Sequence, residues 1–201
     1  DEFRSAHSEI ASWRQHLHAN PEIAYEEKDT SDFIAAKLES FGVEVHRGFG
    51  GTGLVGVIHG NQGDPASGKA IGLRADMDAL PMQETSEVPY ASVNDGVMHA
   101  CGHDGHTAML LGAAEFLSKS KAFNGTVFFI FQPAEEGPPV GEDGGARLML
   151  KEGIFEKRKP DVVFGLHVNP APHGVIAYRE GPTMAAADSW KVIVKGKQAH
   201  G

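Results

Sequence analysis

The order of apolar and polar positions along the chain predicts helices that alternate with buried strands. The three-and-four spacing of apolar residues that is typical of helices occurs in four segments: the opening stretch as far as Pro21, and residues 30–41, 107–118 and 146–151. In the opening stretch, Ile10, Trp13 and Leu17 form the apolar face, and Pro21 is a stop signal. Gly42 closes the second segment in the same way.

Uninterrupted apolar runs predict strands that are buried on both faces, at residues 54–58, 70–75, 126–131 and 161–166. The glycine-rich residues 48–53 lead into the first of these strands, whereas phosphate-binding loops lead from a strand into a helix. We therefore interpret them as a turn. The alternation of such strands with helices is typical of an α/β fold with three α/β/α layers and a largely parallel sheet.

Residues 190–194 differ from the earlier runs, because apolar and polar positions alternate in them. This pattern predicts a strand with one exposed face. A solitary strand is not a stable unit, so we expect this segment to begin a second domain.

Composition narrows the classes of function. The 201 residues are 41% apolar and 22% charged, as in a folded, water-soluble domain. No apolar run approaches the roughly 18 residues of a membrane helix, and no signal-peptide pattern is visible. The net charge of −9, without a dense run of Lys or Arg, disfavours nucleic acid and anionic membranes as partners. We expect a cytoplasmic protein, or a periplasmic or secreted one if a signal peptide has been removed.

The strongest chemical feature is the run HACGHDGH at residues 99–106, which contains the only cysteine of the chain. Thiolate and imidazole are favoured ligands of zinc and similar metals, and glycines let the backbone turn tightly around an ion. We expect Cys101 and His103 to lie on one side of an extended loop. The alternative is that Cys101 is a small core residue and that the histidines merely begin a helix.

Further ligand-type residues stand at the ends of the predicted strands: Asp76 and Asp78, Glu135 and Glu136, and His167. Proteins of the α/β class place their ligand sites at the carboxyl ends of strands. Core packing alone would rarely put ligand-type residues at several strand ends. The pattern therefore predicts one shared site.

Four segments together resemble a known family: residues 74–81 (RADMDALP), 101–107 (CGHDGHT), 132–136 (QPAEE) and 165–167 (GLH). They resemble the two-metal metallopeptidase family that includes aminoacylase, and within it the branch of aminoacylases, hippurate hydrolases and auxin-conjugate amidohydrolases. The resemblance runs through nearly the whole chain. It implies a metal-dependent amidohydrolase that cleaves N-acyl amino acids or similar small amides and dipeptides.

The resemblance also implies roles for single residues. The implied metal ligands are Cys101, His103, Glu136 and His167, the implied general base is Glu135, the implied supporting residue is Asp78, and His200 would hold the oxyanion of the substrate. The ligands would bind two divalent ions. Zinc or manganese is expected first, and cobalt or nickel also suits this ligand set.

The same resemblance implies how the chain is divided. Residues 1–184 would be the N-terminal part of the catalytic domain, and residues 185–201 the first strand of an α+β lid and dimerisation domain. A further His ligand would lie beyond residue 201. The whole protein is expected to be a homodimer or a higher oligomer that acts on a small N-acyl amino acid or peptide.

Two other functions remain open at the level of the sequence. A cysteine hydrolase would use Cys101 as nucleophile and His103 or His106 as base, but it leaves Glu135, Glu136 and His167 without a role. A catalytically silent protein would hold a structural metal. Closed structural sites favour four Cys or His ligands, whereas this set also contains carboxylates.

Overall fold

The computed structural model describes residues 2–66, 68–184, 190 and 192–198. Its elements are α1 (Glu2–Ala19), α2 (Lys28–Ser40), β1 (Glu44–Phe49), β2 (Gly53–His59), β3 (Ala70–Asp76), α3 (His103–Ser120), β4 (Thr126–Gln132), α4 (Gly145–Lys151) and β5 (Val162–Gly165). None of the helices in this described part is long and apolar enough to cross a membrane.

The five strands form one sheet in the order β1-β2-β4-β3-β5. Strand β3 runs parallel to both β4 and β5, whereas β2 is antiparallel to both β1 and β4. Four strands therefore point in one direction and β2 is reversed, which confirms the predicted largely parallel sheet. The carboxyl ends of β3, β4 and β5 meet at one edge, where Asp76 lies opposite Gln132.

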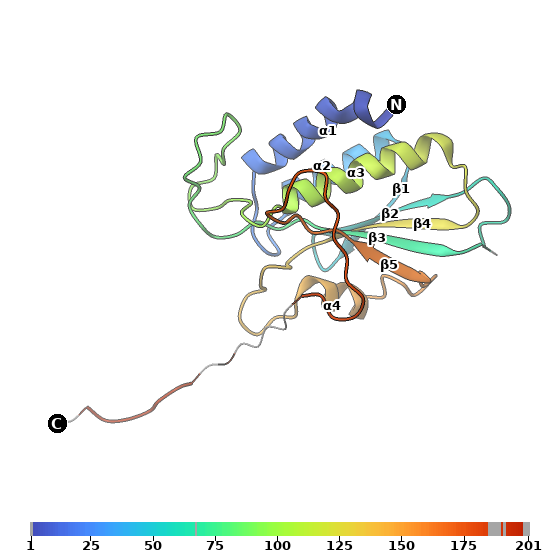
Figure 1. Cartoon of the computed structure of the whole chain (residues 1–201). Helices are drawn as coiled ribbons and strands as arrows, with labels where there is room; N and C mark the ends of the chain where they lie inside the picture. Colours follow the sequence, from blue (N-terminus) through green and yellow to red (C-terminus); the bar gives the residue numbers. More distant parts are fainter. Residues whose placement is uncertain (1, 67, 185–189, 191, 199–201) are drawn as a thin grey trace. The chain divides into compact units, whose positions relative to one another are not determined.

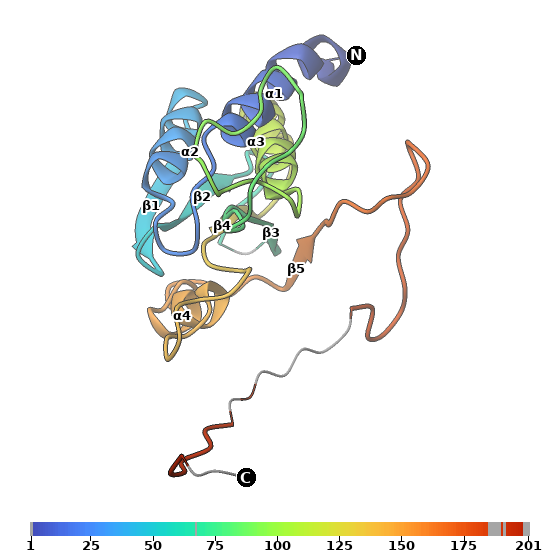
Figure 2. The same cartoon turned by 90° about the vertical axis from the view of Figure 1, so that its left-hand side faces the viewer.

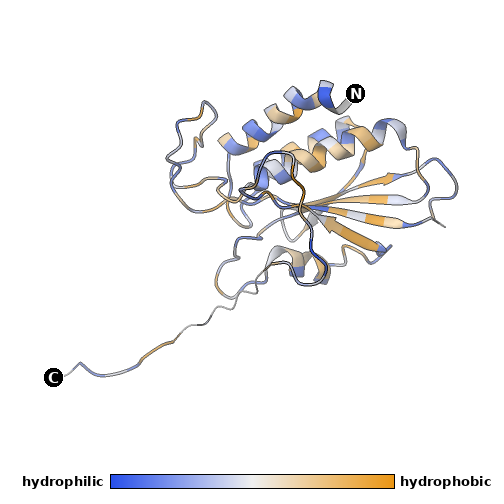
Figure 3. Cartoon of the chain, in the orientation of Figure 1, coloured by the Kyte–Doolittle hydropathy of each residue, from blue (hydrophilic) through white to orange (hydrophobic). Residues whose placement is uncertain are grey.

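Helices cover both faces of this sheet. Figures 1 and 2 show α1, α2 and α3 on one face and α4 on the other. Alternate side chains of β4 point to the two faces, so Phe129 and Phe131 pack in the core under the three helices, while Phe128 and Ile130 pack with Met149 of α4. Strand β4 is buried along its whole length, and Figure 3 shows the strands of the sheet as largely apolar. The three-layer α/β/α prediction is confirmed.

Three elements differ from the prediction. Strand β5 was predicted to be buried on both faces, but Val162, Val163 and Phe164 are 42%, 48% and 56% exposed, because β5 lies at the edge of the sheet and pairs only with β3 in the described part of the chain. Strand β1 was not predicted, because its side chains are polar or only partly buried and its pairing with β2 is interrupted around Gly48, which has a φ of 88°. Helix α3 begins at His103, so this residue does not lie in an extended loop as expected. The apolar pattern of the helix starts later, since its first turn buries polar side chains instead.

Residues Asn169–Gly201 form a unit separate from Asp1–Val168. Its described residues contain no helix or strand, so the predicted strand is not seen at 190 and 192–194. A strand needs a partner for its backbone groups, and none pairs with these residues in the described part of the chain. The division at residue 184 remains a prediction.

Candidate metal centre

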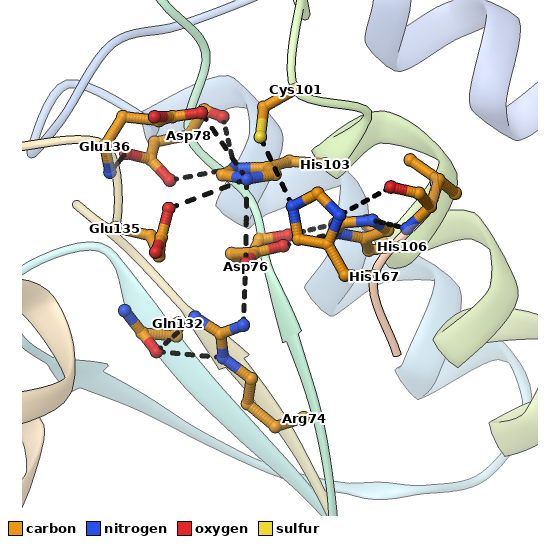
Figure 4. A network of polar contacts seen from close by, with 12 residues as sticks. Arg74, Asp76, Asp78, Cys101, His103, His106, Gln132, Glu135, Glu136 and His167 are labelled. Atoms are coloured by element: carbon orange, nitrogen blue, oxygen red, sulfur yellow. Dashed lines mark hydrogen bonds and ion pairs between the residues drawn. The ribbon is translucent and has the colours of Figure 1, made fainter. Parts of the chain in front are cut away.

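Six of the residues singled out in the sequence lie together at the carboxyl edge of the sheet (Figure 4). They are Asp78, Cys101, His103, Glu135, Glu136 and His167. Of the seven residues to which the resemblance assigns a role, only His200 lies outside the described residues. In two groups, Cys101 with His103 and His167, and His103 with Glu135 and Glu136, the ligand atoms all lie within 4.8 Å of one another. His103 belongs to both groups and is the centre of the arrangement.

The imidazole of His103 is completely buried and held in one orientation. Its Nδ1 lies 2.9 Å from the carbonyl oxygen of Asp78 and 3.2 Å from the Asp78 carboxylate. A carbonyl can only accept, so Nδ1 carries the proton and donates it. Nε2 therefore faces Glu135, Glu136 and Asp76, at 3.7, 3.6 and 3.6 Å from their nearest oxygens. Histidine ligands of metals are commonly oriented in this way.

His167 is oriented similarly from the other side of the site. Its Nδ1 donates to the carbonyl oxygen of Val168 at 2.6 Å, which leaves Nε2 to face the Cys101 sulfur at 3.3 Å. Two imidazoles from distant parts of the chain thus present the same ring nitrogen to the centre of the site.

The two glutamates are positioned through the backbone around them. Ala134 has a φ of 47°, which is unusual for a residue other than glycine, and its N–H donates to the buried carboxyl of Glu27 at 2.9 Å. The N–H of Glu136 donates to the carboxylate of Asp78 at 2.8 Å. Glu27 also accepts a hydrogen bond from Thr52 at 2.6 Å. Buried side chains on both sides therefore fix the direction of Glu135 and Glu136.

Replacing Glu27 by Ala is expected to destabilise the whole protein by about 1–3 kcal/mol, because the buried N–H of Ala134 loses its acceptor. The change should appear as a lower urea midpoint at unchanged slope. Glu27→Gln is the conservative control. Burial raises the pKa of Glu27 and favours its neutral form, so the amide can keep both contacts. Glu26→Ala, at an exposed neighbour, should have almost no effect; equal losses at 26 and 27 would contradict this role.

Asp76 connects the site to the sheet. It accepts hydrogen bonds from His106 Nδ1 and from Arg74 Nη1, both at 2.6 Å, and Arg74 also donates to Gln132 at the end of β4. Burial alone would raise the pKa of Asp76, but the hydrogen bond from His106 and the charge of Arg74 lower it to about 2. Asp76 is therefore an ionised carboxylate beside His103.

The donors fit divalent cations. His103 Nε2 and Glu136 Oε1 are buried, face each other at 3.6 Å, and have no hydrogen-bond partner. Such atoms are costly unless something binds them. Burial and the neighbouring carboxylates Glu136, Glu135 and Asp76 raise the pKa of Cys101 to about 12, so a thiolate here requires a positive charge nearby. Thiol, imidazole and carboxylate together suit zinc and related metals.

Sequence reasoning missed Glu27 in this site, and it assigned no role to Arg74, although Arg74 belongs to one of the four family-like segments. Glu27 lies in a polar stretch and is followed directly by a helix, where an acidic residue usually needs no special explanation. Arg74 lies within an apolar strand, and only the pairing of β3 with β4 brings it to Gln132. His106, named above only as a possible base of a cysteine hydrolase, contacts both Asp76 and Val168.

Comparison with known proteins decides the family. Residues 72–195 match the model of peptidase family M20/M25/M40. The chain belongs to this family. The match confirms the resemblance found in the four motifs, all of which lie within this region.

Individual family members are similar over almost all of this chain. The thermostable carboxypeptidase 2 of Saccharolobus solfataricus is 48% identical over 96% of the chain and 49% of its own length. The hippurate hydrolase of Campylobacter jejuni is 45% identical over 100% of the chain and 50% of its own length. The chain thus spans about half the length of these curated relatives.

A solved structure of the family shows the same fold. The Bacillus subtilis YXEP protein, described as a dinuclear metal binding peptidase from the M20 family, is 40% identical and superposes with a TM-score of 0.73. The similarity covers 83% of this chain and 44% of that protein. The α/β/α arrangement is therefore that of an M20 catalytic domain.

Proposed function

We propose that the whole protein is a metal-dependent amidohydrolase that cleaves the amide bond of N-acyl amino acids or similar small amides and dipeptides. The observation that carries this proposal is the pair of buried atoms His103 Nε2 and Glu136 Oε1, which lie 3.6 Å apart without a hydrogen-bond partner at the edge where the other ligand-type side chains converge. A hippurate hydrolase and a carboxypeptidase among the relatives support an amide substrate from which cleavage releases a free amino acid.

The ligands in this proposal are Cys101, His103, Glu136 and His167. Two divalent ions held by them, zinc or manganese in the first place, would supply the Lewis acidity that polarises an amide carbonyl and acidifies water. Asp78 supports the set by fixing His103 through Nδ1 and Glu136 through its N–H. His200 is proposed to contact the oxyanion of the substrate.

Glu135 is the proposed general base. Its side chain is 42% exposed, more than the 20% of Glu136, so it can meet water and substrate. Burial and the charge of Asp76 raise its pKa, which improves it as a proton acceptor. It would take a proton from the attacking water and pass it to the leaving nitrogen.

A cysteine hydrolase is the second candidate, because the Cys101 sulfur lies 3.3 Å from His167 Nε2. A nucleophilic cysteine needs a lowered thiol pKa, however, and burial with the nearby carboxylates raises that of Cys101 to about 12. This candidate predicts hydrolysis that survives a chelator and is lost on thiol alkylation.

The test is to incubate the whole protein, including any sequence beyond these 201 residues, with hippurate, N-acetyl amino acids and dipeptides. Release of the free amino acid should require added zinc or manganese and stop on chelation. Bound metal without release of amino acid from any of these substrates would contradict the proposal and favour a catalytically silent protein. Hydrolysis that persists without metal would favour the cysteine mechanism.

A further inference from the structure

The backbone of Val168 links His106 to His167. The N–H of Val168 donates to His106 Nε2 at 2.9 Å, and the carbonyl of the same residue accepts from His167 Nδ1 at 2.6 Å. The rings of His106 and His167 lie close as well, with centroids 4.7 Å apart. One residue therefore receives its position from one imidazole and determines the orientation of the other.

The tautomer of His106 is fixed by these contacts. A backbone N–H can only donate, so His106 Nε2 is the unprotonated nitrogen and Nδ1 donates to Asp76. Asp76 is held in turn by Arg74. His106 is itself buried, at 3% exposure, within the first turns of α3. A continuous series of hydrogen bonds thus runs from the sheet to the peptide after His167.

Gly102 makes a second, independent contact with Val168. A Cβ added at Gly102 would lie 2.3 Å from Val168 Cγ2 and 3.7 Å from Val168 Cβ. The φ of Gly102 is also 88°. At Gly105, in the same motif, a Cβ would meet nothing within 4 Å, and the backbone is helical. The two glycines of the motif therefore differ, and only Gly102 provides the space in which Val168 lies.

We propose that Gly102 and His106 are positioning residues that hold Val168, and through Val168 set the place and tautomer of His167 beside Cys101. This inference rests on the proposed metal site. It assigns to the CGHDGH motif a function besides supplying Cys101 and His103: the motif also orients a ligand that arrives from β5. Supporting residues of this kind typically change metal affinity by about 10–100-fold.

The test measures cobalt binding by the whole protein through the sulfur-to-cobalt charge-transfer absorption, which needs no substrate. Gly102→Ala should weaken binding about 10–100-fold, whereas Gly105→Ala should bind as the wild type does. The double variant Gly102→Ala with Val168→Ala keeps the backbone strain at residue 102 but removes the clashing Cγ2. It should recover most of the affinity, which loss through strain alone would not allow.

His106 is tested by two amides of different reach. In His106→Gln the side-chain oxygen can replace Nε2 and accept from Val168, whereas the side chain in His106→Asn reaches only Asp76. We expect His106→Gln to retain the cobalt affinity of the wild type and His106→Asn to lose it. Equal affinity in Gly102→Ala and the wild type, or equal effects of Gln and Asn, would overturn the inference. Cobalt binding without hydrolysis would contradict the proposed function alone, and no cobalt binding by the wild type would contradict both.

Discussion

Glu135→Gln in the whole protein is expected to lower kcat by about 10²–10⁴-fold while the protein keeps its metal. The substitution removes the proton acceptor and leaves the size of the side chain almost unchanged. The carboxylate is partly exposed at the site, and burial with the charge of Asp76 raises its pKa. Steady-state kinetics on an N-acyl amino acid, with metal content measured on the same sample, checks both parts of the expectation.

The neighbouring carboxylate provides the sharpest comparison. Glu136 Oε1 is buried without a hydrogen-bond partner, 3.6 Å from His103 Nε2, so Glu136→Gln should lose metal as well as activity. Glu39→Gln, at an exposed position on α2, controls for the loss of one negative charge and should change neither. If Glu135→Gln turned over substrate at the wild-type rate, the general base would have to be another group.

Cys101→Ala is expected to remove most of the bound metal. Elemental analysis should find nearly two equivalents of a transition metal in the wild-type whole protein and a clear loss in the variant. The reason is the ligand chemistry, because alanine leaves His103 and His167 without the sulfur between them. A variant that keeps two equivalents would exclude Cys101 from the ligands.

We also expect the metal affinity of Cys101→Ala to depend less on pH than that of the wild type. With a pKa of about 12 the free thiol is protonated between pH 6 and 9, so binding a cation as thiolate must release one proton. The release of this proton from the Cys101 thiol should therefore raise the metal affinity of the wild type about tenfold per pH unit. Metal titrations at several pH values give the slope of the logarithm of the affinity against pH. This slope should be smaller by one in Cys101→Ala, because one proton fewer is released. Parallel slopes would mean that the thiol does not bind as thiolate.

The sequence predicted those parts of the molecule that depend on local pattern. Apolar runs located β2, β3, β4 and β5, and the residues after β3, β4 and β5 were expected to converge because parallel strands share an edge. The reversed direction of β2 carries no such pattern, since a strand buried on both faces has the same composition in either orientation.

The supporting contacts were beyond prediction for a different reason. Glu27 reaches Ala134, and His106 reaches Val168, across long stretches of chain. Such contacts depend on how loops lie against one another, and this packing of loops has no characteristic spacing in the sequence. The start of α3 at His103 was not predicted either, because the side chains buried in its first turn are polar and do not continue the apolar pattern of the helix.

The position of His167 just after β5 bears on the order of events during synthesis. Strand β5 is the last strand in the described part of the chain and joins the sheet beside β3, where Ile71 pairs with Val162. During synthesis the N-terminus of a nascent chain leaves the ribosome first, and the chain folds progressively. Cys101, His103 and the glutamate pair therefore leave the ribosome before His167 does, so the proposed set of metal ligands is incomplete during that interval. On the proposed assignment, the group of Cys101, His103 and His167 can therefore assemble only after β5 has paired with β3.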